Sequence, residues 1–149
     1  RNKAKASVNR KKMTQNNSIL KYLKHQPISV ILIIVICVIC MIPVPESQIS
    51  NIRFFDKWTH LTMYAILVAV IMSEYGYRNN VINKKRLLVG GLLAPIIMGG
   101  IVELAQAYLT CGMRSGDWLD FLANSVGALL GSIIGIPLAR VLATRNKDD

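Results

Sequence analysis

Five polar side chains interrupt two long apolar segments in the second half of the chain. Glu103 and Gln106 lie near the end of the first segment, and Asp117, Asp120 and Asn124 lie at the start of the second. Charged and amide groups are costly in hydrocarbon, so they normally face a protein interior or a wet cavity and mark function. Carboxylates and amides in such places suit two kinds of chemistry: binding a polar head group, or acid–base and metal-assisted catalysis.

Helical spacing places these residues on two stripes. Gly99, Glu103 and Gln106 are separated by four and three residues, which is one face of a helix. The second stripe begins with polar residues and continues with glycines alone: Asp117, Asp120, Asn124, Gly127, Gly131 and Gly135. Glycines four residues apart let helix backbones approach closely in membranes. We therefore expect this face to pack on a neighbouring helix while its first turns display the polar groups.

Four further residues extend the set. His60 and Tyr64 are four residues apart on an earlier apolar segment, and Asp56 is placed to cap the start of that helix. Arg114, in the link between the two later segments, could bind a phosphate or a carboxylate or pair with a nearby aspartate. The predicted binding site therefore comprises Asp56, His60, Tyr64, Glu103, Gln106, Arg114, Asp117, Asp120 and Asn124. Glu103, His60 and Asp120 are the catalytic candidates, and no metal or cofactor is predicted.

Each residue also has a structural interpretation. Asp117 could be only an N-cap, Asn124 and Gln106 could be interhelical hydrogen-bonding groups, and His60 could be a satisfied core histidine. Glu103 is the hardest to explain in this way. A carboxylate about 9 Å inside a helix end must be neutral, paired or hydrated.

The elements that position these residues are predicted to be membrane-spanning helices. The chain has 149 residues, 52% of them hydrophobic, and its mean hydropathy is +0.39. Because the apolar residues come in long blocks, we predict an all-α polytopic membrane protein with a bundle of four transmembrane helices. The predicted spans are about 22–43, 57–77, 87–109 and 118–142, between a disordered basic segment, 1–21, and a tail, 143–149.

The charge distribution predicts orientation. A net charge of +10 would suggest a nucleic-acid partner in a soluble protein, but here the basic residues lie between the apolar blocks, so no nucleic acid is predicted. Of the 18 Lys and Arg residues, 15 fall on one side of the predicted membrane and 3 on the other. Omitting residues before Met13, which could be the natural start, leaves 9 against 3. Both termini are therefore predicted to be cytoplasmic, with the polar residues on the extracytoplasmic side.

The same residues resemble those of the VanZ-like family of bacterial membrane proteins. The resemblance rests on two blocks, Phe55-Asp56-Lys57-Trp58-Thr59-His60 followed by Tyr64, and Gly100-x-x-Glu103-x-x-Gln106 followed by Arg114-x-x-Asp117-x-x-Asp120-x-x-x-Asn124-x-x-Gly127-x-x-x-Gly131. It covers about residues 54–135. The family is named after a glycopeptide-resistance accessory protein that raises tolerance to teicoplanin. The resemblance implies a bacterial inner-membrane protein of the cell envelope, and antibiotic resistance by analogy.

The sequence is compatible with three functions. The first is binding or modulating a membrane lipid, a cell-wall precursor or a lipoglycopeptide through an outward-facing polar pocket. The second is a metal- or acid/base-dependent enzyme at the membrane interface acting on a phospho- or glycolipid, although no H-E-x-x-H motif or nucleophile elbow is present. The third is a small oligomeric transporter, although no inverted repeat is visible. The sequence leaves open whether the protein is an enzyme and whether it forms a homo-oligomer.

Overall fold

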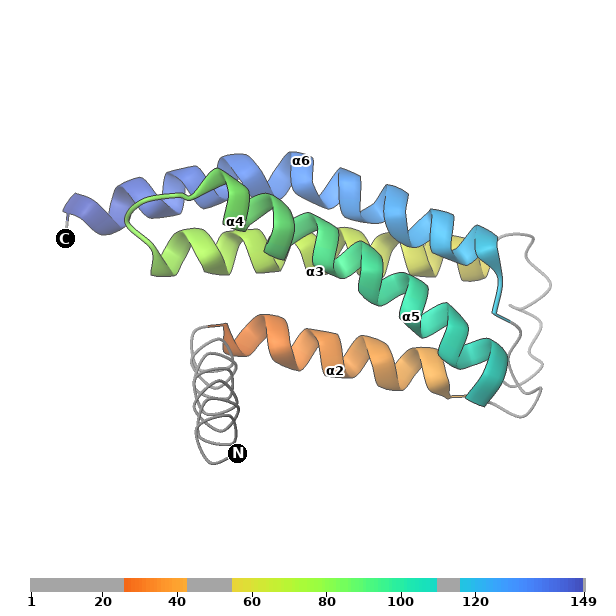
Figure 1. The fold of residues 1–149 in the computed structure, drawn as a ribbon. Coiled ribbons are helices and arrows are strands. Elements are labelled where there is room, and N and C mark those ends of the chain that lie inside the picture. Colours follow the sequence, from red (N-terminus) through yellow and green to blue (C-terminus); the bar gives the residue numbers. More distant parts are fainter. Residues whose placement is uncertain (1–25, 43–54, 110–115, 149) are drawn as a thin grey trace, which may run out of the picture.

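The chain folds into a bundle of helices (Figure 1). The computed structural model describes residues 26–42, 55–109 and 116–148, with side chains up to residue 145. The elements are α2 (Pro27–Met41), α3 (Phe55–Arg78), α4 (Lys84–Leu88), η2 (Val89–Leu93), α5 (Ala94–Leu109) and α6 (Trp118–Asp148). Because α4, η2 and α5 follow one another without a break, the described residues form four helices, as predicted. The all-α class is confirmed.

Two of the four helices are long and apolar enough to cross a membrane: Lys84–Leu109 and Trp118–Arg145. Helix α2 is apolar but has only 15 residues, fewer than the roughly 20 that a span requires. Helix α3 has sufficient length with 24 residues, but polar side chains near both of its ends lower its mean hydropathy. The predicted segment 1–21, Met13 and Arg114 lie outside the described residues.

Helix α2 begins at Pro27, with Gln26 as its non-helical N-cap residue. Proline suits the first helical position, because its φ is already helical and its missing N–H would have no partner there. The predicted span began at residue 22, and residues 22–25 lie outside the described residues. At this end of α2, the buried Glu74 of α3 accepts hydrogen bonds from the backbone N–H groups of Ile28, at 3.3 Å, and Ser29, at 2.9 Å. A carboxylate thus binds the exposed donors at the start of the helix.

The predicted third span is interrupted by one wide helical turn, η2. Pro95 is the second residue of α5, which follows η2 directly. A proline within a helix has no N–H for the carbonyl four residues earlier, here Gly91, and its ring crowds that carbonyl. A π-type turn is a common way to accommodate such a disruption. The turn η2 therefore accommodates Pro95 within an otherwise continuous helical segment.

Helices α3 and α6 form the most extensive helix–helix interface of the structure. A Cβ atom at Gly127 would overlap the carbonyl of Leu61, and one at Gly131 would overlap the carbonyl of Ala65. The glycine stripe predicted from sequence is therefore a packing face, and its partner is α3. This close contact fixes the first turns of α3 and α6 side by side, where the polar residues lie.

Candidate functional site

The polar residues meet at the end of the bundle where α3 and α6 begin and α5 ends (Figure 1). We define the polar cluster as the six residues there that are joined by hydrogen bonds or ion pairs: Lys57, His60, Glu103, Asp117, Asp120 and Asn124. Five of them were predicted as site residues from the sequence. They come from three helices, so the cluster exists only in the folded chain.

A buried chain of three side chains runs through the cluster. Asn124, which is fully buried, donates from Nδ2 to Glu103 Oε1 at 3.2 Å. Its other amide atom, Oδ1, lies 3.0 Å from His60 Nδ1. Glu103 and His60 are themselves 7% and 2% exposed. Helix α6 thus supplies the amide that joins a carboxylate on α5 to an imidazole on α3.

This arrangement selects the tautomer of His60. Because the Glu103 carboxylate takes the Asn124 amide hydrogen, the amide oxygen is the atom that faces the imidazole. An amide oxygen only accepts hydrogen bonds. His60 Nδ1 must therefore carry a hydrogen and donate it, which in the neutral ring leaves a lone pair on Nε2.

Lys57 contacts two carboxylates at the start of α6, those of Asp117 and Asp120. Its ammonium donates to Asp117 Oδ2 and to Asp120 Oδ1, each at 2.8 Å. The hydrogen bond from Lys57 holds the pKa of the Asp117 carboxyl below its usual range. The side chain of Asp120 is almost completely buried, whereas that of Asp117 is about one-third exposed. The ion pairs therefore join the first turn of α3 to the first turn of α6.

Asp117 also has the structural role considered for it. Its Oδ1 accepts a hydrogen bond from the backbone N–H of Leu119 at 2.9 Å, as an N-cap side chain does. Its own backbone N–H donates to Glu103 Oε2 at 3.3 Å. The same residue thus begins α6, pairs with Lys57 and binds the buried carboxylate of α5.

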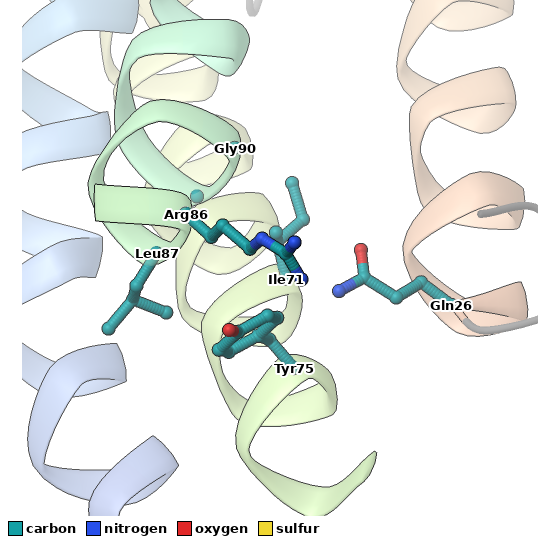
Figure 2. Close-up of a pocket in the computed structure, with 7 residues that line it drawn as sticks. Gln26, Ile71, Tyr75, Arg86, Leu87 and Gly90 are labelled. Atoms are coloured by element: carbon teal, nitrogen blue, oxygen red, sulfur yellow. The ribbon is translucent and has the colours of Figure 1, made fainter. Parts of the chain in front are cut away.

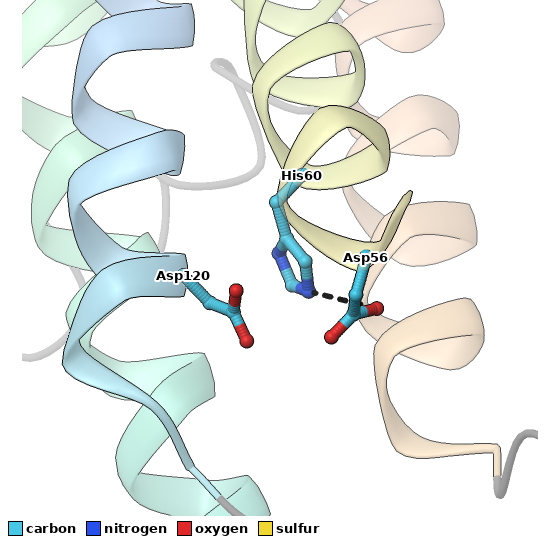
Figure 3. Close-up of side chains that lie close together, drawn as sticks. All are labelled: Asp56, His60 and Asp120. Atoms are coloured by element: carbon cyan, nitrogen blue, oxygen red, sulfur yellow. Dashed lines mark ion pairs between the residues drawn. The ribbon is translucent and has the colours of Figure 1, made fainter. Parts of the chain in front are cut away.

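Asp56 lies beside the cluster in the first turn of α3. Because α3 begins at Phe55, Asp56 is inside the helix and not the residue before it. Its Oδ1 lies 3.9 Å from His60 Nε2, and Figure 3 shows Asp56, His60 and Asp120 facing one another from α3 and α6. One ligand atom of each lies within 4.8 Å of the others.

Two predicted site residues point elsewhere. Gln106 donates from Nε2 to the carbonyl of Cys40 at 2.8 Å and so links α5 to the last turn of α2. Tyr64 is fully buried and packs in a hydrophobic cluster with Ile36, Leu67 and Val102. Its hydroxyl makes no hydrogen bond to the described part of the chain. These positions match the structural interpretation of Gln106 and place Tyr64 in the core.

Two residues of these networks, Lys57 and Glu74, are given no role by the sequence pattern. Lys57 stands in the block that resembles the VanZ-like family, and it precedes His60 by three residues and thus shares its helix face. Glu74 has the same sequence feature as Glu103, because both are ionisable residues within apolar helices. Its carboxylate binds the start of α2, accepting also from Ser29 Oγ at 2.7 Å, and lies 3.8 Å from Arg78 Nε.

A small pocket lies at the opposite end of α3 from the polar cluster. It is lined by Gln26, Ile71, Tyr75, Arg86, Leu87, Gly90 and Gly91. Figure 2 shows the Arg86 side chain between Tyr75 and Gln26. None of the predicted site residues lines this pocket.

The fold and the cluster together define an all-helical protein with two helices able to span a membrane and a buried polar network at one end. Comparison of the chain with protein-family models, with curated proteins and with solved structures finds no match. The resemblance to the VanZ-like family therefore rests on the motif residues alone.

Proposed function

We propose that this chain is an integral membrane protein of the VanZ-like type that binds the polar head group of an envelope lipid or wall precursor at the polar cluster. The exposed apolar surface supports a membrane environment. Only 33% of the apolar window in Lys84–Leu109 and 39% of that in Trp118–Arg145 are buried. A core helix of a soluble protein would be mostly buried, and soluble monomers rarely expose large apolar surfaces.

The apolar residues continue over the outer faces of three helices. Residues more than 40% exposed include Ile31, Ile34 and Val38 on α2, Ile97, Ile101 and Leu104 on α5, and Ile133, Ile134 and Val141 on α6. In a lipid environment these side chains contact acyl chains and cost nothing by their exposure. The proposed location is the bacterial inner membrane, with the polar cluster on the extracytoplasmic side.

The observation that carries the proposed binding role is the buried network at one end of the bundle. Maintaining Glu103, Asp120 and His60 away from water is costly unless each is hydrogen-bonded or paired. Apolar residues alone could pack the end of a helix bundle. A buried polar network in that place is therefore suited to recognising a polar group. The cluster has more acceptors than donors, which favours a ligand with hydroxyl or ammonium donors, such as a glycolipid, a wall precursor or a lipoglycopeptide.

Lipid capture tests this proposal. The full chain is extracted from bacterial membranes, and the lipids that copurify are quantified by mass spectrometry for the wild type, Lys57→Met and Asp120→Asn. We expect one class of envelope lipid or wall precursor with the wild type and a loss of at least fivefold in both variants. Glu74→Gln, which changes a buried carboxylate at the opposite end, is the matched control and should retain the lipid.

Drug sensitivity gives a second readout. By analogy with the VanZ-like family, expression of the wild type should raise tolerance to teicoplanin, and Lys57→Met should abolish the effect. The proposal fails if no envelope lipid or precursor copurifies and sensitivity to teicoplanin is unchanged.

One observation favours a second candidate function, an acid/base-dependent enzyme acting on such a lipid. In the neutral form of its ring, His60 would have a lone pair on Nε2, and it is oriented through Asn124, the arrangement of a general base. Incubating the protein with radiolabelled envelope lipids should then yield a product whose formation is lost in His60→Gln. If the wild type yields no product, this second function is rejected and the binding role is unaffected.

A further inference from the structure

We propose that Asp56, His60 and Asp120 form a binding site for a divalent transition-metal ion, Zn²⁺ or Mn²⁺. The site lies at the surface edge of the polar cluster, between the first turns of α3 and α6 (Figure 3). The sequence assigns no metal site, although a metal-dependent enzyme is one of the three functions that it leaves open, and the structure brings together a defined set of three possible ligands. The metal site is independent of the lipid-binding role, because metal binding can be measured without any lipid.

The geometry provides three ligand atoms in one place. The imidazole nitrogen and one oxygen from each carboxylate lie within 4.8 Å of one another. In a tetrahedral site with bonds of about 2.1 Å, ligand atoms are about 3.4 Å apart. The required contraction is at most about 1.4 Å, and Asp56 can supply it because its side chain is about half exposed. His60 and Asp120 are held in place by burial.

His60 presents the correct nitrogen. Its Nδ1–H is donated to Asn124 Oδ1, so in the neutral imidazole Nε2 is the atom with a lone pair. The side chain is only 3% exposed, and Nε2 makes no hydrogen bond within ranges 26–42, 55–109 and 116–148; it lies 3.9 Å from Asp56 Oδ1. Metal-binding histidines almost always donate the other ring N–H to an oxygen in this way. Asn124, itself held by Glu103, is the corresponding outer partner here.

The electrostatics favour a bound cation. Within the described parts of the chain, the carboxylates of Asp117 and Asp120 share one ammonium group, that of Lys57. Lys57 occupies Oδ1 of Asp120, and a carboxylate can bind a second cation through its other oxygen. A divalent ion between Asp120 and Asp56 would offset the negative charge that Lys57 leaves uncompensated.

The ligand types define the class of metal. One imidazole nitrogen with two carboxylate oxygens suits Zn²⁺ or Mn²⁺, whereas Ca²⁺ and Mg²⁺ prefer oxygen ligands alone. Three protein ligands are also the number that catalytic zinc sites use, with water or substrate completing the coordination. Such an ion could contact a lipid head group directly.

Calorimetric titration of the purified full chain in detergent with Zn²⁺, and electron paramagnetic resonance with Mn²⁺, test the proposal. We expect one ion per chain for the wild type and an affinity at least tenfold lower in Asp56→Asn and in His60→Gln. Asp56→Asn is the safer variant for folding, since this side chain is half exposed. Lys57→Gln should bind the ion several-fold more tightly, because a like charge beside Asp120 is removed.

Glu74→Gln serves as the control and should bind as the wild type does, because its carboxylate lies at the other end of α3. X-ray absorption of the zinc-loaded protein should show one imidazole ligand, and that signal should disappear in His60→Gln. The proposal is overturned if the wild type binds neither ion stoichiometrically, or if Asp56→Asn and His60→Gln bind with wild-type affinity. Either result would leave the lipid-capture outcome unchanged, so the two proposals can fail separately.

Discussion

Asn124 is the residue on which the buried part of the polar cluster depends. Its amide satisfies Glu103 and His60 at the same time, and its side chain is fully buried. Replacing it by leucine leaves a buried carboxylate with one donor fewer and an imidazole without its acceptor. We expect Asn124→Leu to lower the free energy of unfolding by about 1–3 kcal/mol, the usual cost of an unsatisfied buried polar group. Denaturant titration in mixed micelles measures this change.

The neighbouring Ser125 provides the control for Asn124. Its hydroxyl donates only to the carbonyl of Phe121 in the same helix, at 2.8 Å. Ser125→Ala should therefore change stability by less than about 0.5 kcal/mol. Equal losses in Asn124→Leu and Ser125→Ala would contradict a special role for the amide.

The ion pair between Lys57 and Asp117 predicts a pH dependence. Because the hydrogen bond from Lys57 lowers the pKa of Asp117 in the folded protein, the unfolded state binds more protons in acid. This stabilisation is fully present above the ordinary value of 3.8 and is lost as the pH falls through the lowered pKa of the folded state. The difference in melting temperature between the wild type and Asp117→Asn should therefore be constant near neutral pH and shrink below about pH 4. A difference in melting temperature that stays constant down to the lowest accessible pH would contradict this prediction.

At the scale of helices, sequence periodicity predicts which residues share one face of a helix better than it predicts which other helix packs on that face. The stripe of Asp120, Asn124, Gly127 and Gly131 was assigned correctly to one face of α6, because a helix repeats every three to four residues whatever surrounds it. That this face packs on α3, with Gly131 against Ala65, depends on the axial alignment of two helices distant in sequence. The spacing within one helix carries no information about that alignment.

The same limit explains why the sequence pattern assigns no role to Lys57 and groups Gln106 with Glu103. Lys57 reaches Asp117 and Asp120 because α3 begins at Phe55, two residues before the predicted start. Gln106 lies on the stripe of Glu103, but one turn further along α5 it meets α2 and donates to Cys40. Two side chains on one face can therefore contact different neighbours.

The glycine face gives a prediction at this scale. A Cβ atom at Gly131 would overlap the carbonyl of Ala65, whereas one at Gly100 would lie 3.4 Å from the ring of Phe121, an ordinary contact. We expect Gly131→Ala to destabilise the protein by about 1–3 kcal/mol, since backbone must move apart. Gly100→Ala should be neutral or slightly stabilising, because alanine favours helix over glycine. Unfolding titrations of the two variants compare the positions directly, and similar stabilities would argue against close contact of α3 and α6.

At the scale of the whole molecule, the buried charged groups that the structure describes lie at the two ends of the bundle. The polar cluster lies where α3 begins, and Glu74 binds the start of α2 where α3 ends. Between these ends the outer faces of α2, α5 and α6 are apolar. This distribution suits a membrane, whose two aqueous faces are separated by hydrocarbon of about 30 Å.

The charge asymmetry then predicts which end faces the cytoplasm. Lys84, Lys85 and Arg86 begin α4, on the side that the positive-inside rule assigns to the cytoplasm. Two exposed positions near opposite ends of α3 can be used to test this orientation. Phe55 is 49% exposed and Val81 is 73% exposed. In a background with all three native cysteines replaced, a membrane-impermeant maleimide added to intact cells should label Phe55→Cys and leave Val81→Cys unlabelled. Val81→Cys should become reactive once the membrane is opened by detergent, which confirms that the cysteine is accessible. Labelling of Val81→Cys alone in intact cells would reverse the orientation and place the polar cluster in the cytoplasm, where it could not meet an extracytoplasmic wall precursor or glycopeptide.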